Sequence, residues 1–247
     1  FGDNKAMMEL GLMYDNGKGI TQDHKKAKYW YEKAANLGNS DAMNNLAYCY
    51  ANGEGVTKDF IKAKYWNDKA AILGNSLSMA NLGEFYEKGL GVTKDYKKAK
   101  YWYEKAAKLE NSDAINSLGN LYSKGFGVVK DCQEAKYWYE MGAKLGDANS
   151  MYNLGELYNM NTPQGAYLVI QDNCDEIKDN KLAIEWHERS AQSGNIISLF
   201  KLGEINEAMG KYDKAKEWYE KASENDLVGA MGIKKLQIKA QVMHHFY

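Results

Sequence analysis

Proline is almost absent from this sequence of 247 residues, which contains one proline against 23 glycines. Proline breaks helices and stiffens linkers, whereas glycine adopts the backbone angles that tight turns require. The balance therefore favours helices joined by glycine-containing turns and argues against proline-rich linkers. Long apolar runs are also absent, so the sequence contains no candidate for a transmembrane helix, and we expect no insertion into a membrane.

An excess of charge of either sign is missing as well. The chain has 32 basic and 33 acidic residues, which gives a formal net charge of -1. Proteins that bind nucleic acids or anionic membranes are drawn to them by a surplus of positive charge, and this chain has none. We therefore expect no nucleic acid partner.

Cysteine is scarce. The three cysteines, Cys49, Cys132 and Cys174, are odd in number and irregularly spaced. Disulfide-stapled repeat proteins carry cysteines at equivalent positions in each unit, so we expect no disulfide framework, which slightly favours the cytoplasm. The chain begins at Phe1 without an initiator methionine, so we expect it to have been trimmed or processed. The compartment stays unknown, with the periplasm or the exterior open if a signal was removed before Phe1.

What the sequence does contain is one segment in many copies. Residues 95–107 read D-Y-K-K-A-K-Y-W-Y-E-K-A-A and have close counterparts along nearly the whole chain. A tryptophan marks each copy, and the first four are spaced at 36 residues. Self-similarity at a period of about 20 to 50 residues predicts a solenoid, in which each unit buries its apolar face against its neighbours. The tryptophans lie on the apolar stripe of the predicted helix, so we expect them in the core. They are Trp30, Trp66, Trp102, Trp138, Trp186 and Trp218.

The third unit shows the repeated pattern most clearly. Its first helix carries L-G-E-F-Y at 82–86, with apolar and small residues at helical spacing. Gly89 and Gly91 can adopt positive φ and end this helix, and Asp95 can cap the second helix. Each unit is therefore predicted to contain a first helix, here called helix A, a glycine turn, and a second helix, here called helix B.

The last two units depart from this pattern. In the fifth unit 28 residues separate Gly155 from Ala183, against 16 in the unit before, so twelve residues are inserted within about 159–178. Insertions in repeat arrays form loops on one face and often carry function. The sixth unit has lost four residues from its turn, and we expect a final helix at 228–242 to cap the array.

The pattern A-x-x-x-L-G-x-x-Y-x-x-G-x-G, followed by D-x-x-K-A-x-x-W-Y-x-K-A-A, resembles the Sel1-like repeat (SLR), a relative of the tetratricopeptide repeat with a longer turn. The resemblance covers the chain from Gly2 to about Ala230. It implies an all-α, right-handed α-solenoid superhelix of six helix-turn-helix repeats, about 36 residues each, with a C-terminal capping helix. We expect one domain, residues 1–247, with repeats at about 2–37, 38–73, 74–109, 110–145, 146–193 and 194–225.

The resemblance also implies a class of function. Proteins with such repeats are typically adaptors that assemble complexes, and some bacterial members neutralise a partner toxin. We therefore expect a non-catalytic scaffold that binds a protein or peptide partner, and we expect it to be a monomer. The alternative is an immunity or inhibitor protein that neutralises a toxin or enzyme partly through the 159–178 insertion. A third hypothesis, a peptidoglycan or β-lactam hydrolase, follows from a cysteine-rich branch of the family whose paired cysteines this sequence lacks.

Motifs for catalysis or metal binding find little support. The glycine turns lack the Gly-Lys-Ser/Thr of a phosphate-binding loop, and no strand precedes them. Ser198 and Lys201 match the S-x-x-K of penicillin-binding serine enzymes, but no K-T-G accompanies them. The four histidines are scattered, apart from His244 and His245 near the end of the chain. We therefore expect no enzyme activity, no cofactor and no metal ion.

Helix A lines the groove of tetratricopeptide-like arrays, so its outward positions form the predicted binding surface. Alignment of the units puts isolated apolar residues, amides and acids there, which suits a polypeptide with apolar anchors and some positive charge. We call the following set the groove residues: Met8, Leu12, Asn44, Tyr48, Asn52, Glu84, Glu87, Asn116, Asn120, Tyr152, Glu156, Phe200, Glu204 and Glu207, with Lys5, Asp15, Asp41, Ala80, Lys88, Asp113, Lys124 and Asn159 on the same face. The candidates for partner contact in the insertion are Tyr167, Leu168, Ile170 and Asp172.

Overall fold

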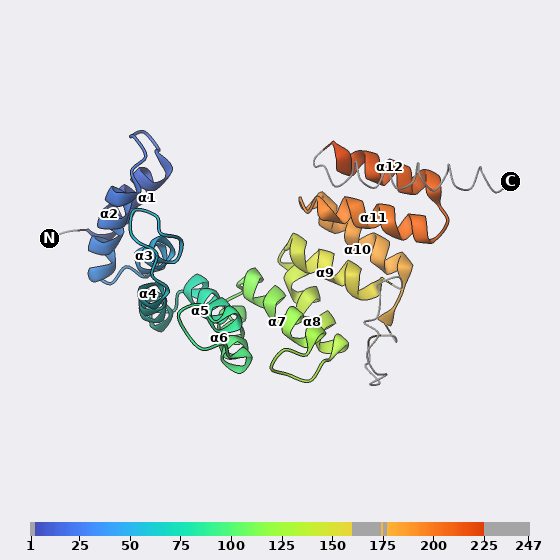
Figure 1. The fold of residues 1–247 in the computed structure, drawn as a ribbon, viewed down its shortest axis with the longest axis horizontal. Helices are drawn as coiled ribbons and strands as arrows, with labels where there is room; N and C mark the ends of the chain where they lie inside the picture. The colour runs from blue at the N-terminus through green and yellow to red at the C-terminus, as the bar shows by residue number, and fades with distance from the viewer. Residues whose placement is uncertain (1–2, 160–173, 175–176, 225–247) are drawn as a thin grey trace. The chain divides into compact units, whose positions relative to one another are not determined.

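The structure is a computed structural model, and it describes residues 3–159, 174 and 177–224. Within these ranges twelve α-helices follow one another as pairs joined by turns (Figure 1). None of these helices is long and apolar enough to cross a bilayer. The predicted all-helical array of helix-turn-helix units is therefore confirmed. The helices are α1 (Asn4–Asn16), α2 (His24–Asn36), α3 (Ser40–Asn52), α4 (Phe60–Ile72), α5 (Ser76–Lys88), α6 (Tyr96–Ala107), α7 (Ser112–Lys124), α8 (Cys132–Lys144), α9 (Ala148–Tyr158), α10 (Asn180–Gln192), α11 (Ile197–Ala208) and α12 (Tyr212–Ser223).

The chain divides into two compact units, which we describe separately. The first runs to Leu121 and includes Phe126–Val128, and the second contains Tyr122–Gly125 and the chain from Val129 onward. In the first unit, successive helices from α1 to α6 pack against each other in chain order. In the second unit, α8 to α12 do the same.

Aspartate side chains fix where the helix B segments begin. Asp95 accepts hydrogen bonds from the backbone N–H groups of Lys97 and Lys98, at 3.1 and 3.0 Å. These N–H groups have no carbonyl partner inside the helix, so the cap satisfies them. The predicted cap is therefore confirmed, and four equivalent helices use Asp23, Asp59, Asp131 and Asp179. The last one, α12, begins after Lys211 without a side-chain cap.

The glycine turns require backbone angles that other residues seldom adopt. Gly89 has φ 74° and donates its N–H to the carbonyl of Phe85, which ends α5. Gly91 has φ 65°, and a Cβ at this position would lie 2.8 Å from Cβ of Phe60, the first residue of α4. The second glycine thus allows the turn to lie against the preceding repeat. The prediction that these loops are turns is confirmed.

A close contact between a glycine of helix A and a ring of helix B occupies the centre of most repeats. A Cβ built on Gly83 of α5 would lie 2.4 Å from the ring of Tyr103 of α6, so only glycine lets the two helices approach this closely. The same contact joins α1 to α2, α9 to α10 and α11 to α12, where the ring belongs to Tyr31, His187 and Tyr219 respectively.

The second repeat replaces both partners of this contact. Ala47 of α3 stands at the glycine position, and Asn67 of α4 stands where other repeats have a ring; both side chains are buried. The added methyl group is offset by the smaller partner, as a close-packed interior requires. Alanine is tolerated here because its partner changed with it.

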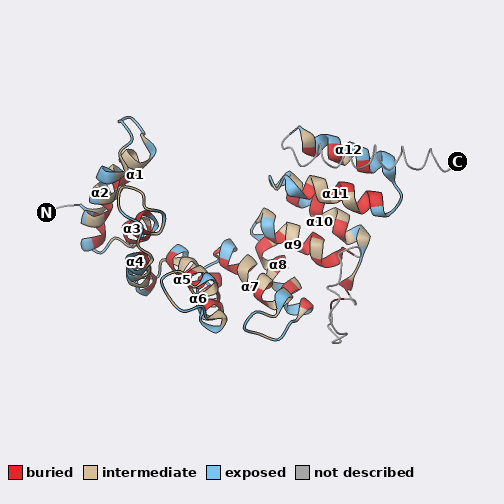
Figure 2. Cartoon of the chain, viewed as in Figure 1, coloured by how far each residue is buried: buried red, intermediate tan, exposed pale blue. Residues whose placement is uncertain are grey.

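The tryptophans contribute less to the core than predicted. Trp66 is buried with 9% of its surface exposed, whereas the other five are only partly buried. The residue after each tryptophan faces helix A instead, so Tyr31, Tyr103 and Tyr139 are at most 3% exposed. Buried residues accordingly follow one side of each helix in Figure 2. The prediction is correct for Trp66, and Trp186 packs against the edge of the core although it is only partly buried. The central position goes to the following residue, since only one of two adjacent aromatic residues on a helix can point at the same neighbour.

The prediction that the cysteines form no disulfide is wrong. Cys132, the first residue of α8, forms a disulfide with Cys174, and the two Cα atoms are 5.1 Å apart. Cys49 is a free, buried cysteine. No disulfide was expected because the cysteines do not recur with the repeat. That argument covers bonds within or between repeats, but this bond joins a repeat to the insertion. The correction removes the argument for a reducing compartment.

Several predictions fall outside the described residues. The insertion candidates Tyr167, Leu168, Ile170 and Asp172 lie there, as do the capping helix at 228–242 and the histidines His244 and His245. These assignments stay predictions.

Candidate groove between two helix A segments

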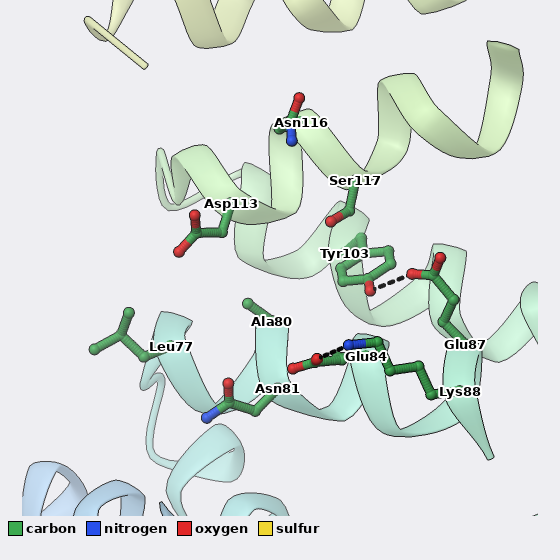
Figure 3. Close-up of a pocket in the computed structure, with 10 residues that line it drawn as sticks. All are labelled: Leu77, Ala80, Asn81, Glu84, Glu87, Lys88, Tyr103, Asp113, Asn116 and Ser117. Carbon is green, nitrogen blue, oxygen red and sulfur yellow. Dashed lines mark hydrogen bonds and ion pairs between the residues drawn. The ribbon is translucent and has the colours of Figure 1, made fainter. Parts of the chain in front are cut away.

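A pocket of about 290 Å³ lies in the first unit between α5 and α7, the helix A segments of the third and fourth repeats (Figure 3). Both helices turn side chains of the same helical face toward it, and Tyr103 of α6 reaches it from between them. The pocket therefore lies on the surface that the sequence assigned to partner binding. Its lining consists of Leu77, Ala80, Asn81, Glu84, Glu87, Lys88, Tyr103, Asp113, Asn116 and Ser117.

Helical periodicity explains why these residues meet. The α5 residues follow one another at three- and four-residue steps, from Leu77 through Asn81 and Glu84 to Lys88, and so share one face of the helix. Residues Asp113 and Asn116 do the same on α7. Repetition of the unit then places two such faces opposite each other.

The pocket carries more negative than positive charge. Its three carboxylates belong to Glu84, Glu87 and Asp113, and its one ammonium belongs to Lys88, which forms an ion pair with Glu84. The hydrogen bond and the charge of Glu84 raise the pKa of Lys88. The Tyr103 hydroxyl donates to Glu87 at 2.7 Å, and burial together with this carboxylate raises the pKa of that phenol.

An apolar side chain stands at one edge of the pocket. Leu77, at the start of α5, has 52% of its surface exposed. Glu84 and Asp113 supply negative charge, and the amides of Asn81 and Asn116 can both donate and accept hydrogen bonds. The lining thus combines apolar, amide and acidic groups, which is the combination expected from the sequence.

The structure brings some groove residues together and gives others internal roles. Glu84, Glu87 and Asn116 line the pocket, with Ala80, Lys88 and Asp113 from the same face. Leu77, Asn81, Tyr103 and Ser117 were missed. The first two lie on the same face of α5 as the predicted residues, and Tyr103 belongs to α6, a helix B segment that the prediction did not consider. A wider helical stripe, taken from the same alignment, would have included Leu77 and Asn81.

Two groove residues are buried. Asn44 donates to the Ser78 hydroxyl at 2.9 Å, linking α3 to α5, and it is 9% exposed. Glu207 accepts from the Tyr219 hydroxyl at 3.0 Å and is 5% exposed. Both have little surface left to offer a partner. By contrast, Tyr48 is 53% exposed.

The remaining groove residues lie outside the pocket. Within the first unit they are Met8, Leu12, Asn52 and Asn120. In the second unit they are Tyr152, Glu156, Phe200 and Glu204.

The second unit contains a polar cluster formed by its helix A segments α9 and α11 together with α10. Lys201 lies 3.5 Å from one Glu156 oxygen and 3.1 Å from Glu204, and the buried ring of His187 lies 3.3 Å from the other Glu156 oxygen. Burial opposes the charge of Glu156, but the contacts with His187 and Lys201 more than offset it and hold the pKa of Glu156 below its usual range. The cluster therefore ties α9, α10 and α11 together.

The S-x-x-K motif does not form an accessible nucleophile. Ser198 is fully buried, and its hydroxyl donates to Ser190 at 2.8 Å. Burial opposes the charge of Lys201, but Glu156 and Glu204 outweigh it and raise the pKa of Lys201. A lysine that serves as a base must lose its proton, so this environment works against that role.

These features define a helical-repeat protein that presents polar and apolar side chains on its helix A segments. Comparison with protein families identifies it further. A model of the Sel1 repeat matches residues 4–39, 40–75, 76–111, 112–147, 148–161, 175–195 and 198–227. The chain belongs to the Sel1 repeat family, and the gap between the fifth and sixth of these matches falls in the insertion.

Solved structures give the same result. A Sel1 repeat protein from Oxalobacter formigenes is 33% identical, with a TM-score of 0.77, and the match covers 91% of this chain and 89% of that one. A protective antigen of uropathogenic Escherichia coli with an SLR fold is 28% identical, with a TM-score of 0.79, and the match covers 97% of this chain and 50% of that one.

An immunity protein from Pseudomonas aeruginosa shares the fold, with 20% identity, a TM-score of 0.57 and coverage of 93% and 83% of the two chains. A comparison with curated proteins found no match. Sel1 repeats form a helical fold that generally mediates protein–protein interaction, and the family is typically non-catalytic.

Proposed function

We propose that the protein is a non-catalytic scaffold that binds a polypeptide partner along its helix A segments. The pocket between α5 and α7 is the observation that carries this proposal, because two successive repeats contribute complementary chemical groups to one concavity. In a helical array such a surface repeats along the chain, so an extended or helical segment can follow it from one repeat to the next.

The lining also indicates which segment would fit. Three carboxylates face one lysine, so the pocket favours a segment that carries arginine or lysine. The exposed Leu77 at its edge can receive an apolar anchor, and a few such anchors carry most of the free energy of binding in protein interfaces. The proposed ligand is a polypeptide segment with one apolar side chain and one or two basic side chains.

Affinity capture with matched baits tests this proposal. One bait is the unaltered chain, and a second carries Glu84→Lys and Asp113→Lys, which reverse the charge of the pocket. A control bait carries Glu134→Lys and Glu217→Lys, the same change in net charge at exposed positions on helix B segments. We expect partners of the unaltered chain to be retained by the control and lost from the pocket variant. Equal retention by both variants would contradict the groove proposal.

A second candidate function is that of an inhibitor or immunity protein that uses the insertion. The observation in its favour is the Cys132–Cys174 disulfide, which attaches the insertion covalently to the start of α8. Such a bond reduces the entropy that a loop loses when it binds, which favours use of the loop in recognition. A fourth bait, with residues 160–173 replaced by a short glycine–serine linker, tests this role. Loss of one specific partner from this bait alone would favour the inhibitor, and retention would favour the scaffold.

A further inference from the structure

Three potential metal ligands meet at the junction of the first two repeats. Asp15 lies near the end of α1, His24 is the first residue of α2, and Glu54 lies in the turn after α3. His24 Nδ1 is 2.8 Å from Asp15 Oδ1 and 4.0 Å from Glu54 Oε2, and the three ligand atoms all lie within 4.8 Å of one another. All three side chains are partly buried.

We propose that Asp15, His24 and Glu54 form a binding site for a divalent transition-metal ion, with Zn²⁺ as the best match. In a tetrahedral zinc site, ligand atoms about 2.0 to 2.1 Å from the metal are roughly 3.3 Å from one another. The two distances from the imidazole nitrogen lie on either side of this value. Small side-chain rotations would therefore bring the three atoms to a common centre, and one coordination position would remain open to water or to a partner.

A hydrogen bond also orients one of the two carboxylates. The Tyr31 hydroxyl donates to the second oxygen of Asp15 at 3.1 Å. Metal sites in proteins are commonly built with such outer hydrogen bonds, which orient the ligands. Tyr31 belongs to the core of the first repeat, and the third repeat has the equivalent bond between Tyr103 and Glu87.

The two carboxylates of the site, those of Asp15 and Glu54, have no lysine or arginine partner among the described residues. Elsewhere in the chain partly exposed acids commonly have such a partner, as Glu32 has Lys28. Two close carboxylates repel each other in the absence of a cation, so the arrangement favours binding of one.

Comparison with the next two repeats shows that His24 and Glu54 are peculiar to this junction, whereas the carboxylate of Asp15 has a counterpart in Glu87 of the third repeat. The positions of His24 and Glu54 are occupied in the next repeat by Phe60 and Leu90, and one repeat later by Tyr96 and Phe126. The rings of this last pair stack with their centroids 4.8 Å apart. The fold therefore needs only apolar contact here, and the imidazole and carboxylate at the first junction serve no packing role that the repeat requires.

The turn geometry brings the ligands together reproducibly. A Cβ on Gly55 would lie 2.2 Å from the backbone oxygen of His24, so the glycine turn that carries Glu54 lies directly against the start of α2. The same contact recurs between Gly91 and Phe60. The backbone of the repeat thus sets the distance between the histidine and the glutamate, and the site is built on a rigid frame.

Calorimetric titration of the EDTA-treated full chain with ZnCl₂ tests this proposal. All proteins carry His244→Ala and His245→Ala, so that the terminal histidines cannot bind the metal. We expect one Zn²⁺ per chain and a rise in melting temperature on binding. His24→Phe and Glu54→Leu, which restore residues of the next repeat, should each weaken binding at least about tenfold.

The matched control is His187→Tyr, which removes a different histidine and restores the ring of the other repeats. It should bind Zn²⁺ like the parent, and circular dichroism should show that every variant is folded. Absence of saturable binding up to millimolar ZnCl₂ would overturn the proposal. The same affinity in the parent and His24→Phe would overturn it as well.

Discussion

At the scale of single residues, the contact between a helix A glycine and a helix B ring determines how closely two helices pack. The contact with Gly83 leaves no room for a Cβ beside Tyr103, and the second repeat satisfies the same constraint with Ala47 and Asn67. The chain thus packs this contact in two ways, either as glycine against a ring or as alanine against asparagine. Exchanging one pair for the other by mutation tests whether the two residues compensate each other.

A double-mutant cycle on this pair is the first prediction. Gly83→Ala should destabilise the chain by about 1 to 3 kcal/mol, because the new methyl group overpacks the core. Tyr103→Asn should also destabilise, because it leaves a cavity. The double variant, which copies the second repeat, should lose clearly less than the sum of the two, since each change relieves the other. Urea denaturation measures all three, and strictly additive losses would contradict the proposed compensation.

Alkaline pH should destabilise the fold through its buried tyrosines. Burial raises the pKa of Tyr139 to about 12, whereas an unfolded tyrosine titrates near pH 10, about two units lower. Between these values only the unfolded chain loses its proton, so the contribution of Tyr139 to stability is complete below pH 10 and lost by about pH 12. The loss amounts to about 3 kcal/mol.

Tyr139→Phe checks this prediction. The free energy of unfolding of this variant should fall less steeply between pH 10 and 12 than that of the parent, in denaturation series at fixed ionic strength. Tyr137→Phe, an exposed neighbour on α8, is the control for loss of a hydroxyl. If the free energy of unfolding of Tyr139→Phe fell between pH 10 and 12 as steeply as that of the parent, the buried phenol would not be a cause of the alkaline destabilisation.

The residues that recur from repeat to repeat predicted the glycine or alanine at the centre of helix A and the aspartate that caps helix B. They did not show which of two adjacent aromatics faces the core. Trp102 and Tyr103 are both aromatic and both recur, and their periodicity is the same. Only the packing of α5 against α6 shows that Tyr103 takes the central position.

At the scale of elements, the disulfide and the insertion form one feature. Cys132 begins α8 and Cys174 belongs to the insertion, so the bond ties a segment without repeat sequence to the array. The boundaries of the insertion could be predicted, because α10 resumes the repeat pattern with its cap at Asp179. The bond could not, because no second copy of either cysteine exists to compare.

Loss of this disulfide should destabilise the second unit. The bonded cysteines are 42 residues apart in sequence, and closing a loop of this length stabilises a fold by about 4 kcal/mol in the chain-entropy model. Cys174→Ser should lower the melting temperature, and dithiothreitol should do the same to the parent but not to the variant. A thiol assay on the unfolded, unreduced parent should find one free cysteine, Cys49. Three free thiols would contradict the bond.

The pocket also belongs to this scale. Its helices were predictable, and so was the face of α5 that carries Glu84, because that face varies while the core letters recur. The exposure of Leu77 and the bond between Tyr103 and Glu87 were not predictable from the sequence. Both depend on how the helices pack, and the bond joins α5 to α6 within the third repeat.

At the scale of the whole molecule, the chain is a Sel1 repeat protein whose two compact units share one repeat design. Stability in such arrays comes from contacts between adjacent units, whereas specificity comes from the positions left free to vary. The fold followed from the period of the sequence, because ten or so recurring positions leave few alternatives. The identity of a partner could not be predicted, because the helix A positions that we propose for binding differ from repeat to repeat and carry no periodic signal.

Hydrogen–deuterium exchange on the chain bound to its captured partner is the measurement that tests the groove most directly. Binding along helix A should slow exchange in α5 and α7, and leave α6 and the solvent-facing turns near their rates in the free chain. The Glu84→Lys and Asp113→Lys variant should show no such protection. Protection confined to the segment around Cys174, with α5 and α7 unchanged, would contradict the groove account and favour the insertion.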